Sequence, residues 1–581
     1  MSWLSEAHER LYKVRHKMML CLVKCALGSP SDVKVDRLVS RRQKLFTRGT
    51  SGANGGSGHG HHNGNGHEQH GPKEPHSFEV SFYHINDVHA HLDQYRTSGA
   101  ACTDPAQGCV GGYARVKTII EEQRPSKKNS LFLNAGDEFQ GTLFYTLYKG
   151  EKIAITLNQL GFDAMTLGNH EFDDGDDLLS EFITNLTFPI VSSNVHTEHP
   201  KLSKQLIPYK IFPRFKIALL ALTTETTKFI SNPSNLTSFE DPVAAAQRTV
   251  QLIKKQHPDI NRIVALTHIG YEQDILLAQN TTGISLIIGG HSHTLLGDIP
   301  GAAGPYPTIA KNLDGDEVFI VTAYRWGEYL GYIDVEFDKE GKIVSYEGAP
   351  IHLTNTTALE SKLESDILEW EEPFAVFERT VIGVTDNALS TSTCQSAECT
   401  IGDLTGDALE AYRPGPVGAI MNAGGIRISI DAGNITLQQA LDCFPFGNAY
   451  VQLNVTGAQL WDAIESVVSK VNVNNGLTVT SFAQVSKSIQ FTYNPLNPNG
   501  SKLITLSIAG QPVVLSQTYL IATTDYVARG GDNFWPAHSG FAILETLDVV
   551  FGDYVKAQSP INYQLDGRIA TTNETTPQKG N

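Results

Sequence analysis

Five short apolar runs, each ending in a polar turn, most strongly constrain the fold of this 581-residue chain. The runs are FEVSFYHIND, SLFLNAGDEF, DAMTLGNHEF, NRIVALTHIG and SLIIGGHSHT. Between them lie segments with helical periodicity, such as GGYARVKTIIEEQ and DPVAAAQRTVQLIKKQ. Strands that alternate with helices predict an α/β domain, in which a ligand site forms where strand ends meet loops.

The turns after these runs carry side chains of the types that bind divalent metals. They supply Asp87, His89, Asp137, Asn169, His170, His268, His291 and His293. A lone histidine is usually satisfied by hydrogen bonds, but five strand ends of this kind in series are hard to attribute to chance. Carboxylate, imidazole and amide ligands together favour zinc, manganese or iron over magnesium or calcium. So many ligands exceed the needs of one ion, which predicts two metals sharing a carboxylate, the arrangement suited to cleaving phosphate esters.

Net charge and hydropathy limit the classes of partner. A formal net charge of −17 argues against wrapping DNA or RNA, because their phosphates need a broad basic face. No run reaches the roughly 18 apolar residues of a membrane span, and the polar C-terminal TTNETTPQKGN lacks the apolar tail of a GPI signal. We therefore expect a small-molecule partner, no nucleic acid polymer, no transmembrane segment and no GPI tail.

The cysteines and glycosylation sequons bear on the compartment. Cys102 and Cys109 bracket one short loop, and Cys394 and Cys399 bracket another. Loops of this length are able to close as disulfides, with free buried thiols as the alternative. Eight Asn-X-Ser/Thr sequons favour the secretory route, so we expect an extracellular protein, although residues 18–27 match a signal peptide poorly.

Changes in composition and residue pattern along the chain predict five segments. Residues 1–76 end in a Gly-, Asn-, Ser- and His-rich stretch, whose composition favours a disordered linker over a metal-binding tract. The others are the α/β domain at 77–353, a linker helix at 354–380, a second domain with helices and many short strands at 381–571, and a polar tail at 572–581.

The motifs HINDVHAHL, NAGDEFQGT, GNHEFDDG, LTHIG and GGHSHT resemble the five blocks of the calcineurin-like metallophosphoesterases. Their form, and the C-terminal half, resemble the 5′-nucleotidase family over about residues 78–570. The resemblance implies a four-layer α/β/β/α catalytic domain followed by an α+β nucleotide-binding domain. It also implies that two divalent metals hydrolyse nucleoside 5′-monophosphates through in-line attack of a metal-activated water, zinc being favoured over manganese, iron and cobalt.

The resemblance also implies roles for individual residues of the catalytic domain. Asp137 would bridge two metals, one held by Asp87, His89 and His293 and the other by Asn169, His268 and His291. His170 resembles the family's catalytic histidine, which stabilises the transition state or protonates the leaving group, and Asp173 would orient it. A helix-capping role is the plainer alternative for His170.

In the second domain, the motifs NAGGIR, FPFGN and TTDYVARGGDNF resemble the family's nucleotide site. By this resemblance Asn422 and Arg427 contact the substrate, and a guanidinium suits phosphate. Phe446 and Tyr526 would sandwich the base, for which core packing is the alternative, and Asp532 would accept the ribose hydroxyls.

Two departures from the family pattern bear on substrate preference. Gln395 stands where the family often has an arginine, and Asp403 replaces an asparagine, so both lower the positive charge expected near the substrate. Nucleoside di- or triphosphates, UDP-sugars and 2′,3′-cyclic nucleotides therefore remain alternatives within the same chemistry. A phosphatase without a base clamp, and a secreted binding protein that has lost activity, are the other hypotheses. The sequence assigns no role to Cys443.

Overall fold

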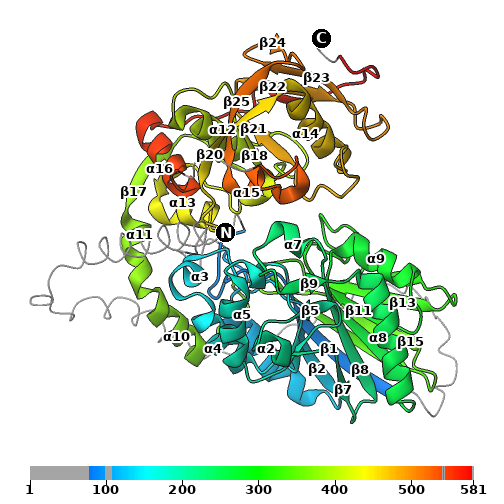
Figure 1. The fold of residues 1–581 in the computed structure, drawn as a ribbon. Helices are drawn as coiled ribbons and strands as arrows, with labels where there is room; N and C mark the ends of the chain where they lie inside the picture. Colours follow the sequence, from blue (N-terminus) through cyan, green and yellow to red (C-terminus); the bar gives the residue numbers. More distant parts are fainter. Residues whose placement is uncertain (1–77, 98–101, 103–107, 539–540, 542–543, 579–581) are drawn as a thin grey trace, which may run out of the picture. The chain divides into compact units, whose positions relative to one another are not determined.

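The computed structural model describes residues 78–97, 102, 108–538, 541 and 544–578 (Figure 1). The segment 1–76, for which we predict disorder, lies outside the described residues, as do its histidines and cysteines. Among the described residues, none of the helices combines the length and apolarity needed to cross a bilayer.

The first sheet has eight strands and is parallel at its centre. Its path runs β15–β14–β1–β2–β3–β4–β6, and β16 pairs with β14. The strands are β1 (Phe78–Ile85), β2 (Ser130–Asn134), β3 (Ala164–Met165), β4 (Ile190–Val191), β6 (Leu206–Ile207), β14 (Tyr329–Phe337), β15 (Ile343–Gly348) and β16 (Ile351–His352). Because β1, β2 and β3 pair in parallel, their carboxyl ends lie along one edge of the sheet.

The second sheet has six strands in the order β12–β13–β11–β10–β8–β7, with β8, β10, β11 and β13 parallel. The strands are β7 (Tyr209–Phe212), β8 (Ile217–Thr223), β10 (Arg262–His268), β11 (Leu286–Gly289), β12 (Thr308–Lys311) and β13 (Glu317–Thr322). The carboxyl ends of β10 and β11 lead directly into His268 and into the turn that carries His291 and His293.

The two sheets pack face to face, and helices cover the second sheet. Strand β8 reads IALLALT and is buried throughout, as expected for a strand covered on both faces. Its Leu219 joins a core cluster with Phe82 and Leu133 of the first sheet. The next residue, Leu220, packs instead in the cluster that contains Val250 of α8 (Pro242–Gln256) and residues of α9 (Tyr271–Gln279).

Helices also lie against the first sheet, which completes the layer order of helix, sheet, sheet and helix. The Tyr83 hydroxyl of β1 donates to Gln123 at the end of α2 (Tyr113–Gln123). The Phe132 ring of β2 stacks on Phe162, just after α4 (Gly150–Leu160). The predicted α/β class is therefore confirmed.

The linker is divided rather than being one helix. Helix α10 (Ser361–Glu371) begins at Glu360, whose carboxylate accepts from two backbone N–H groups of the first turn. A 3₁₀ turn η4 (Glu372–Phe374) with proline near its start separates α10 from α11 (Ala375–Arg379). The proline has no N–H to continue the helical ladder, so the helix is interrupted there.

Residues from Ile382 to Ile569 share one hydrophobic cluster. Helix α12 (Thr400–Tyr412) covers the predicted helical stretch DLTGDALEAYR almost completely. The other principal elements are β17 (Val381–Thr385), β18 (Ile420–Asn422), β19 (Gly433–Thr436), α13 (Leu437–Cys443), β20 (Tyr450–Thr456), α14 (Gly457–Ser469), β21 (Ala483–Val485), β22 (Ile489–Tyr493), β23 (Leu503–Ile508), β25 (Thr518–Thr524), α15 (Asp525–Ala528), α16 (Leu547–Gln558) and β26 (Ile569–Thr571). Helices with many short strands match the predicted α+β texture, and the boundaries at 353 and 381 stay predictions.

Candidate active site

Left-handed backbone conformations cluster at the turns where we predict metal ligands. Five non-glycine residues there have positive φ: Asp87 (53°), His89 (50°), Asp137 (60°), His291 (82°) and His293 (50°). Such conformations are uncommon for residues with a Cβ, and they concentrate where a site fixes side-chain direction. The backbone therefore aims these side chains into a common space.

The candidate ligands gather into two sets. Asp87, His89 and His293 form one, and Asp137, His268 and His291 form the other, with the ligand atoms of each set within 4.8 Å of one another. Asp137 Oδ2 lies 3.0 Å from His268 Nε2 and 3.8 Å from His89 Nε2, so one carboxylate faces both sets.

Buried atoms without partners test whether these residues fit metal ions. His268 Nδ1 lies 2.7 Å from the carbonyl oxygen of Ala135 and must donate to it, so Nε2, which lies 3.0 Å from Asp137 Oδ2, carries either a proton or the lone pair that would bind a metal. Asn169 Oδ1 is buried without a hydrogen-bond partner. His89 Nδ1 donates to the carbonyl oxygen of Phe139, and its Nε2 faces His293 Nε2 at 3.0 Å. Lone pairs that converge in this way are unfavourable unless a cation lies between them, so the donor set fits metal binding.

The charges of the buried carboxylates and histidines also favour a bound cation. Burial lowers the pKa of His268, but the carboxylates of Asp137 and Asp87 overcome this and raise it to about 10. Burial also opposes charge on Asp137, yet His268 and His170 hold the pKa of its carboxyl well below the usual range. Two fully buried carboxylates therefore demand positive charge at this point.

The acidic residues in and just after the turn TLGNHEFDDG have different roles. Glu171, which sequence reasoning did not assign, is fully buried, and its carboxylate accepts backbone N–H groups of Gly168, Asp137 and Glu138. It thereby joins this turn to the turn that carries Asp137. Asp176 is also buried, and it accepts from the Thr237 hydroxyl.

His170 and Asp173 form a close pair beside the metal ligands. His170 Nδ1 lies 2.7 Å from Asp173 Oδ2, and the backbone N–H of His170 donates to Asp137 Oδ1 at 2.8 Å. Burial lowers the pKa of His170, but the carboxylates of Asp173 and Asp137 produce a net rise. Ser231, a residue that the motifs did not reveal, donates to Asp173 Oδ1 at 2.6 Å. Asp173 therefore has one oxygen for the imidazole and one for the hydroxyl that holds it.

Three of the predicted nucleotide-binding residues lie together in the second half of the chain. Asn422 Nδ2 donates to Asp532 Oδ2 at 2.8 Å, and the Thr480 hydroxyl donates to Asp532 Oδ1. Asp532 has a left-handed φ of 53°. Burial is the largest cause that raises the pKa of the partly buried Tyr526, and the charge of Asp532 is the next. Asp532 is therefore a fixed acceptor at the end of a polar network.

The other two residues contact the metal-binding turns. Arg427 Nη2 lies 3.4 Å from His89 Nε2, and its guanidinium lies 5.3 Å from the centre of the Phe446 ring. The Phe446 ring stacks on His170 with centroids 5.3 Å apart and planes 16° apart. Arg427 and Phe446 therefore approach the metal ligands and the His170–Asp173 pair directly. A base sandwich between Phe446 and Tyr526 stays a prediction.

One expectation is wrong. Asp403, which we expected near the substrate, is fully buried beside Arg568, with Arg568 Nε 3.3 Å from its Oδ1. It therefore packs beside a buried arginine and is not among the contacts of the predicted nucleotide-binding residues. Gln395, by contrast, lies near the NAGGIR loop, because its side-chain oxygen accepts from the backbone N–H of Phe482, the residue whose carbonyl oxygen accepts from Ala423 N.

Both short cysteine loops are closed by disulfides, Cys102–Cys109 and Cys394–Cys399. Cys443 is a free thiol, fully buried, and burial raises its pKa above the usual range. This thiol is therefore a packed side chain without thiolate character.

Two family models match the chain. Residues 80–295 match the calcineurin-like phosphoesterases, and residues 381–539 match the 5′-nucleotidase C-terminal domain. The 5′-nucleotidase of Homo sapiens is 33% identical over 529 residues, which cover 85% of this chain and 91% of that protein. The snake venom 5′-nucleotidase of Naja atra is 33% identical over 530 residues, covering 85% of this chain and 98% of the relative.

Solved structures give the same result. The 5′-nucleotidase precursor of Thermus thermophilus has a TM-score of 0.79 at 32% identity, covering 86% of this chain and 100% of that chain. The regions that match the family models contain both ligand sets, the His170–Asp173 pair, Arg427, Phe446 and Asp532.

Proposed function

This chain belongs to the 5′-nucleotidase family, and we propose that it hydrolyses nucleoside 5′-monophosphates to a nucleoside and inorganic phosphate with two divalent metal ions. One observation carries the proposal. Buried metal-binding atoms converge there: His89 Nε2 faces His293 Nε2 at 3.0 Å, and the Asp137 carboxylate faces His268 Nε2 at 3.0 Å. On the other side, Arg427 approaches the same centre from the nucleotide-binding half of the chain.

We propose that Asp137 bridges the metals, one held by Asp87, His89 and His293 and the other by Asn169, His268 and His291. The mixture of carboxylate, imidazole and amide donors favours zinc, with manganese, iron and cobalt as alternatives. When bound, the metals polarise the phosphoryl oxygens and lower the pKa of a bound water, which is the nucleophile.

The protein's own groups supply proton transfer at the leaving oxygen. His170 directs Nδ1 to Asp173, which leaves Nε2 as the atom that faces the substrate. In its protonated form, His170 donates the Nε2 proton to the ribose oxygen as the bond to phosphorus breaks. Asp173, itself fixed by Ser231, keeps the imidazole in this orientation and stabilises its charge.

The second half of the chain selects the nucleoside. Arg427 binds the phosphoryl oxygens, and Asp532, oriented by Asn422, accepts the ribose hydroxyls. Phe446 and Tyr526 stack on the base, and because every base has a π face, this contact accepts purines and pyrimidines alike.

We also propose that the protein is extracellular and glycosylated. Two disulfides support an oxidising compartment. All eight sequon asparagines are exposed: Asn185, Asn235, Asn280, Asn355, Asn434, Asn454, Asn499 and Asn573. A mass loss on treatment of the secreted protein with an N-glycosidase is the expected result.

A substrate panel on the purified, metal-loaded protein tests the proposed activity. AMP, ADP, ATP, UDP-glucose and a 2′,3′-cyclic nucleotide are compared, with phosphate release and nucleoside release measured separately. We expect AMP to give the highest kcat/KM and chelation to abolish turnover. A loaded protein that is inert on AMP but hydrolyses ATP or UDP-glucose would refute the monophosphate assignment. An unchanged KM for AMP in Tyr526→Ala would refute the base contact.

A further inference from the structure

The loop after β13 holds an arginine against the metal-binding turns. Arg325 stands between two non-glycine residues with left-handed backbones, Tyr324 at φ 65° and Trp326 at φ 56°. The backbone N–H of Trp326 donates to the carbonyl oxygen of Asp87 at 2.7 Å, and Asn86 Nδ2 donates to the carbonyl oxygen of Tyr324 at 2.7 Å. The loop is therefore tied to the turn that carries a predicted metal ligand, and two strained residues fix where Arg325 points.

Aromatic rings support the guanidinium of Arg325. Its Cζ lies 3.9 Å from the centre of the Trp326 ring and 5.2 Å from the centre of the Tyr324 ring. Trp326 is buried and stacks in turn on His91, with centroids 4.7 Å apart and planes 19° apart. Stacking of this kind orients a guanidinium while leaving its N–H groups available in the plane of the group.

Among the described residues, no acidic group pairs closely with this guanidinium. The Arg325 side chain forms no ion pair or hydrogen bond there, and its Nε is buried without a partner. Burial raises the pKa of the Glu328 carboxyl, His352 and then Arg325 lower it, and the close partner of that carboxylate is His352 Nε2 at 3.2 Å. A partly buried cation without an anion is costly, so the position calls for a negatively charged ligand.

Arg325 shares its surroundings with the proposed active site. Trp326, which supports the guanidinium, stacks on His91, and His91 Nδ1 donates to the carbonyl oxygen of His89 at 2.9 Å. Arg427 Nη2 lies 3.4 Å from Nε2 of the same His89. Both guanidinium groups therefore border the turn that carries His89, and two positive charges beside one site favour an anionic ligand.

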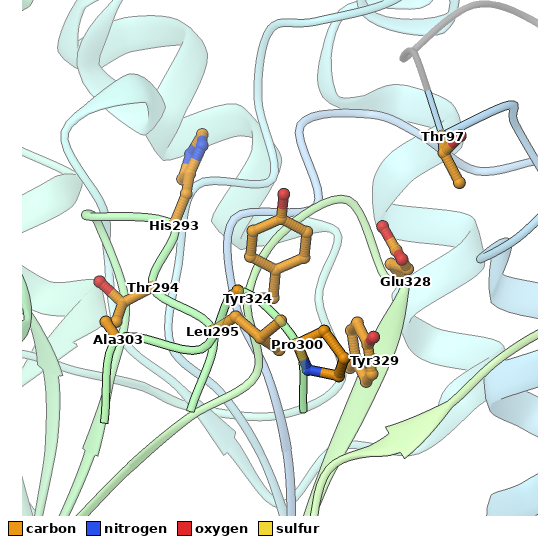
Figure 2. A pocket seen from close by; sticks show the side chains of 10 residues that line it. Thr97, His293, Thr294, Leu295, Pro300, Ala303, Tyr324, Glu328 and Tyr329 are labelled. Carbon is orange, nitrogen blue, oxygen red and sulfur yellow. The ribbon is translucent and has the colours of Figure 1, made fainter. Parts of the chain in front are cut away.

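A pocket borders Tyr324, the residue before Arg325, although Arg325 itself is not one of its lining residues. Its volume is about 480 Å³, and His293, Tyr324 and Glu328 contribute to its lining (Figure 2). Figure 2 shows the Tyr324 ring between His293 and Glu328, so the ring that supports Arg325 also borders the pocket. The pocket adjoins the metal ligands because His293 belongs to both.

We propose that Arg325 is a second phosphate-binding arginine, which together with Arg427 binds the phosphoryl group of the substrate and the phosphate product. This inference rests on the proposed function. Arg325 lies outside both regions that match a family model, so the matches do not assign it. Gln395, beside the loop of Arg427, is neutral, and Arg325 supplies from the first half of the chain a positive charge that Gln395 does not provide.

The test compares three substitutions in the metal-loaded full chain. Arg325→Ala removes the charge and the stacking, Arg325→Lys keeps the charge, and Arg413→Ala removes an exposed arginine that stacks on Tyr412 outside the site. A charge-assisted hydrogen bond to phosphate is worth about 1.5–3 kcal/mol, or roughly a 10- to 100-fold change in binding. We therefore expect Arg325→Ala to weaken inhibition by inorganic phosphate, and to raise the KM for AMP, by about 10- to 100-fold. Arg325→Lys should recover part of the loss, and Arg413→Ala should change neither quantity.

Inhibition by adenosine separates phosphate binding from a structural role, because adenosine has no phosphate. We expect its inhibition constant to stay unchanged in Arg325→Ala, and direct calorimetry of inorganic phosphate to reproduce the weakened affinity. Unchanged phosphate affinity, or equal weakening of phosphate and adenosine, would overturn the role of Arg325. Failure of the wild-type protein to hydrolyse AMP is a different result, which rejects the proposed function itself.

Discussion

Two clusters of carboxylates, one in each half of the chain, bring possible ligand atoms similarly close together but differ in their counter-charges and in burial, since Asp566 of the second cluster is exposed. The first contains Asp87 and Asp137 with their histidines, and the second contains Glu398, Asp403 and Asp566. The ligand atoms of each set lie within 4.8 Å of one another. By composition and spacing alone, both clusters qualify as metal sites.

The second cluster contains its own cation. Arg568 is 1% exposed, and its Nη1 lies 2.9 Å from Asp407 Oδ1 while its Nη2 lies 2.8 Å from Asp566 Oδ2. The Glu398 carboxylate accepts backbone N–H groups of residues 566, 567 and 569. Burial raises the pKa of Asp403 to about 8 although Arg568 lowers it, so this carboxyl is protonated at neutral pH.

Among the described residues, no arginine or lysine pairs with the carboxylates of the first cluster, and Arg427 contacts the His89 imidazole instead. The cluster has imidazole nitrogens that face one another, His89 Nε2 and His293 Nε2, and the buried Asn169 Oδ1 without a partner. The comparison teaches that acidic residues alone do not identify a metal site. What identifies it is the combination of buried carboxylates with neutral donors whose lone pairs nothing in the chain satisfies.

The same substitution in both clusters should give the largest contrast. Asp137→Asn keeps the size of the side chain and an oxygen for the backbone N–H of His170, but it removes the charge that we propose is shared by the two metals. We expect turnover of AMP to fall to background and the metal content to fall below two ions per chain, measured by mass spectrometry of the metals. Retention of two metals with normal turnover would show that Asp137 is not a bridge.

Asp403→Asn is the matched control and should leave turnover and metal content unchanged. The folded-state pKa of Asp403 lies above its usual value, so its contribution to stability is present at low pH and is lost as pH rises from about 4 to 8. The wild-type protein should therefore lose stability relative to Asp403→Asn over this range, by at most about 1.4 kcal/mol per pH unit. Parallel stability curves from urea unfolding at several pH values would contradict the protonated state.

Removal of the internal cation should destabilise the second cluster without changing the chemistry of the first. Arg568→Ala leaves Asp407 and Asp566 without their buried partner, and breaking such a pair costs about 3–5 kcal/mol. The free energy of unfolding in urea measures this loss, while the folded fraction should keep its metals. Lys556→Ala, which removes an exposed pair with Asp553, is the control and should change stability by less than about 1 kcal/mol. A loss no larger than that of the control would mean that the buried arginine is not needed.

The sequence predicted the first cluster well, for a physical reason. Asp87 and Asp137 follow parallel strands of the first sheet and His268 ends a parallel strand of the second, so strand ends could be expected to carry the site. The division of these residues into ligand sets came from the family resemblance of the motifs. The sequence did not predict the second cluster, because Asp403 and Arg568 are 165 positions apart and belong to no shared motif. Nor did it predict Arg325, whose position depends on backbone dihedrals and on stacking with Trp326 rather than on a pattern of residue types.

The smallest contrast comes from two glutamates that organise the loops around the clusters. Glu171 accepts the backbone N–H groups of Gly168, Asp137 and Glu138, and Glu398 accepts three beside Arg568. In each, glutamine turns one acceptor oxygen into an N–H₂ group that faces backbone donors, at a cost of about 1–3 kcal/mol. Because Glu171 positions ligands, we expect Glu171→Gln to lower metal affinity and kcat by about 10- to 100-fold.

Glu398→Gln should instead lower only the free energy of unfolding, with metal affinity and kcat unchanged. The exposed Glu151 is the control for both, since its carboxylate pairs with Lys152 at the surface. Equal losses of metal affinity in Glu171→Gln and Glu398→Gln would show that the two clusters are not independent. A loss of stability without loss of metal affinity in Glu171→Gln would assign this glutamate to folding alone. We therefore expect metal affinity to fall in Glu171→Gln and stability alone to fall in Glu398→Gln. Buried hydrogen bonds of the same kind hold metal ligands in the first cluster and stabilise the fold in the second, because only the first cluster needs a cation from outside the chain.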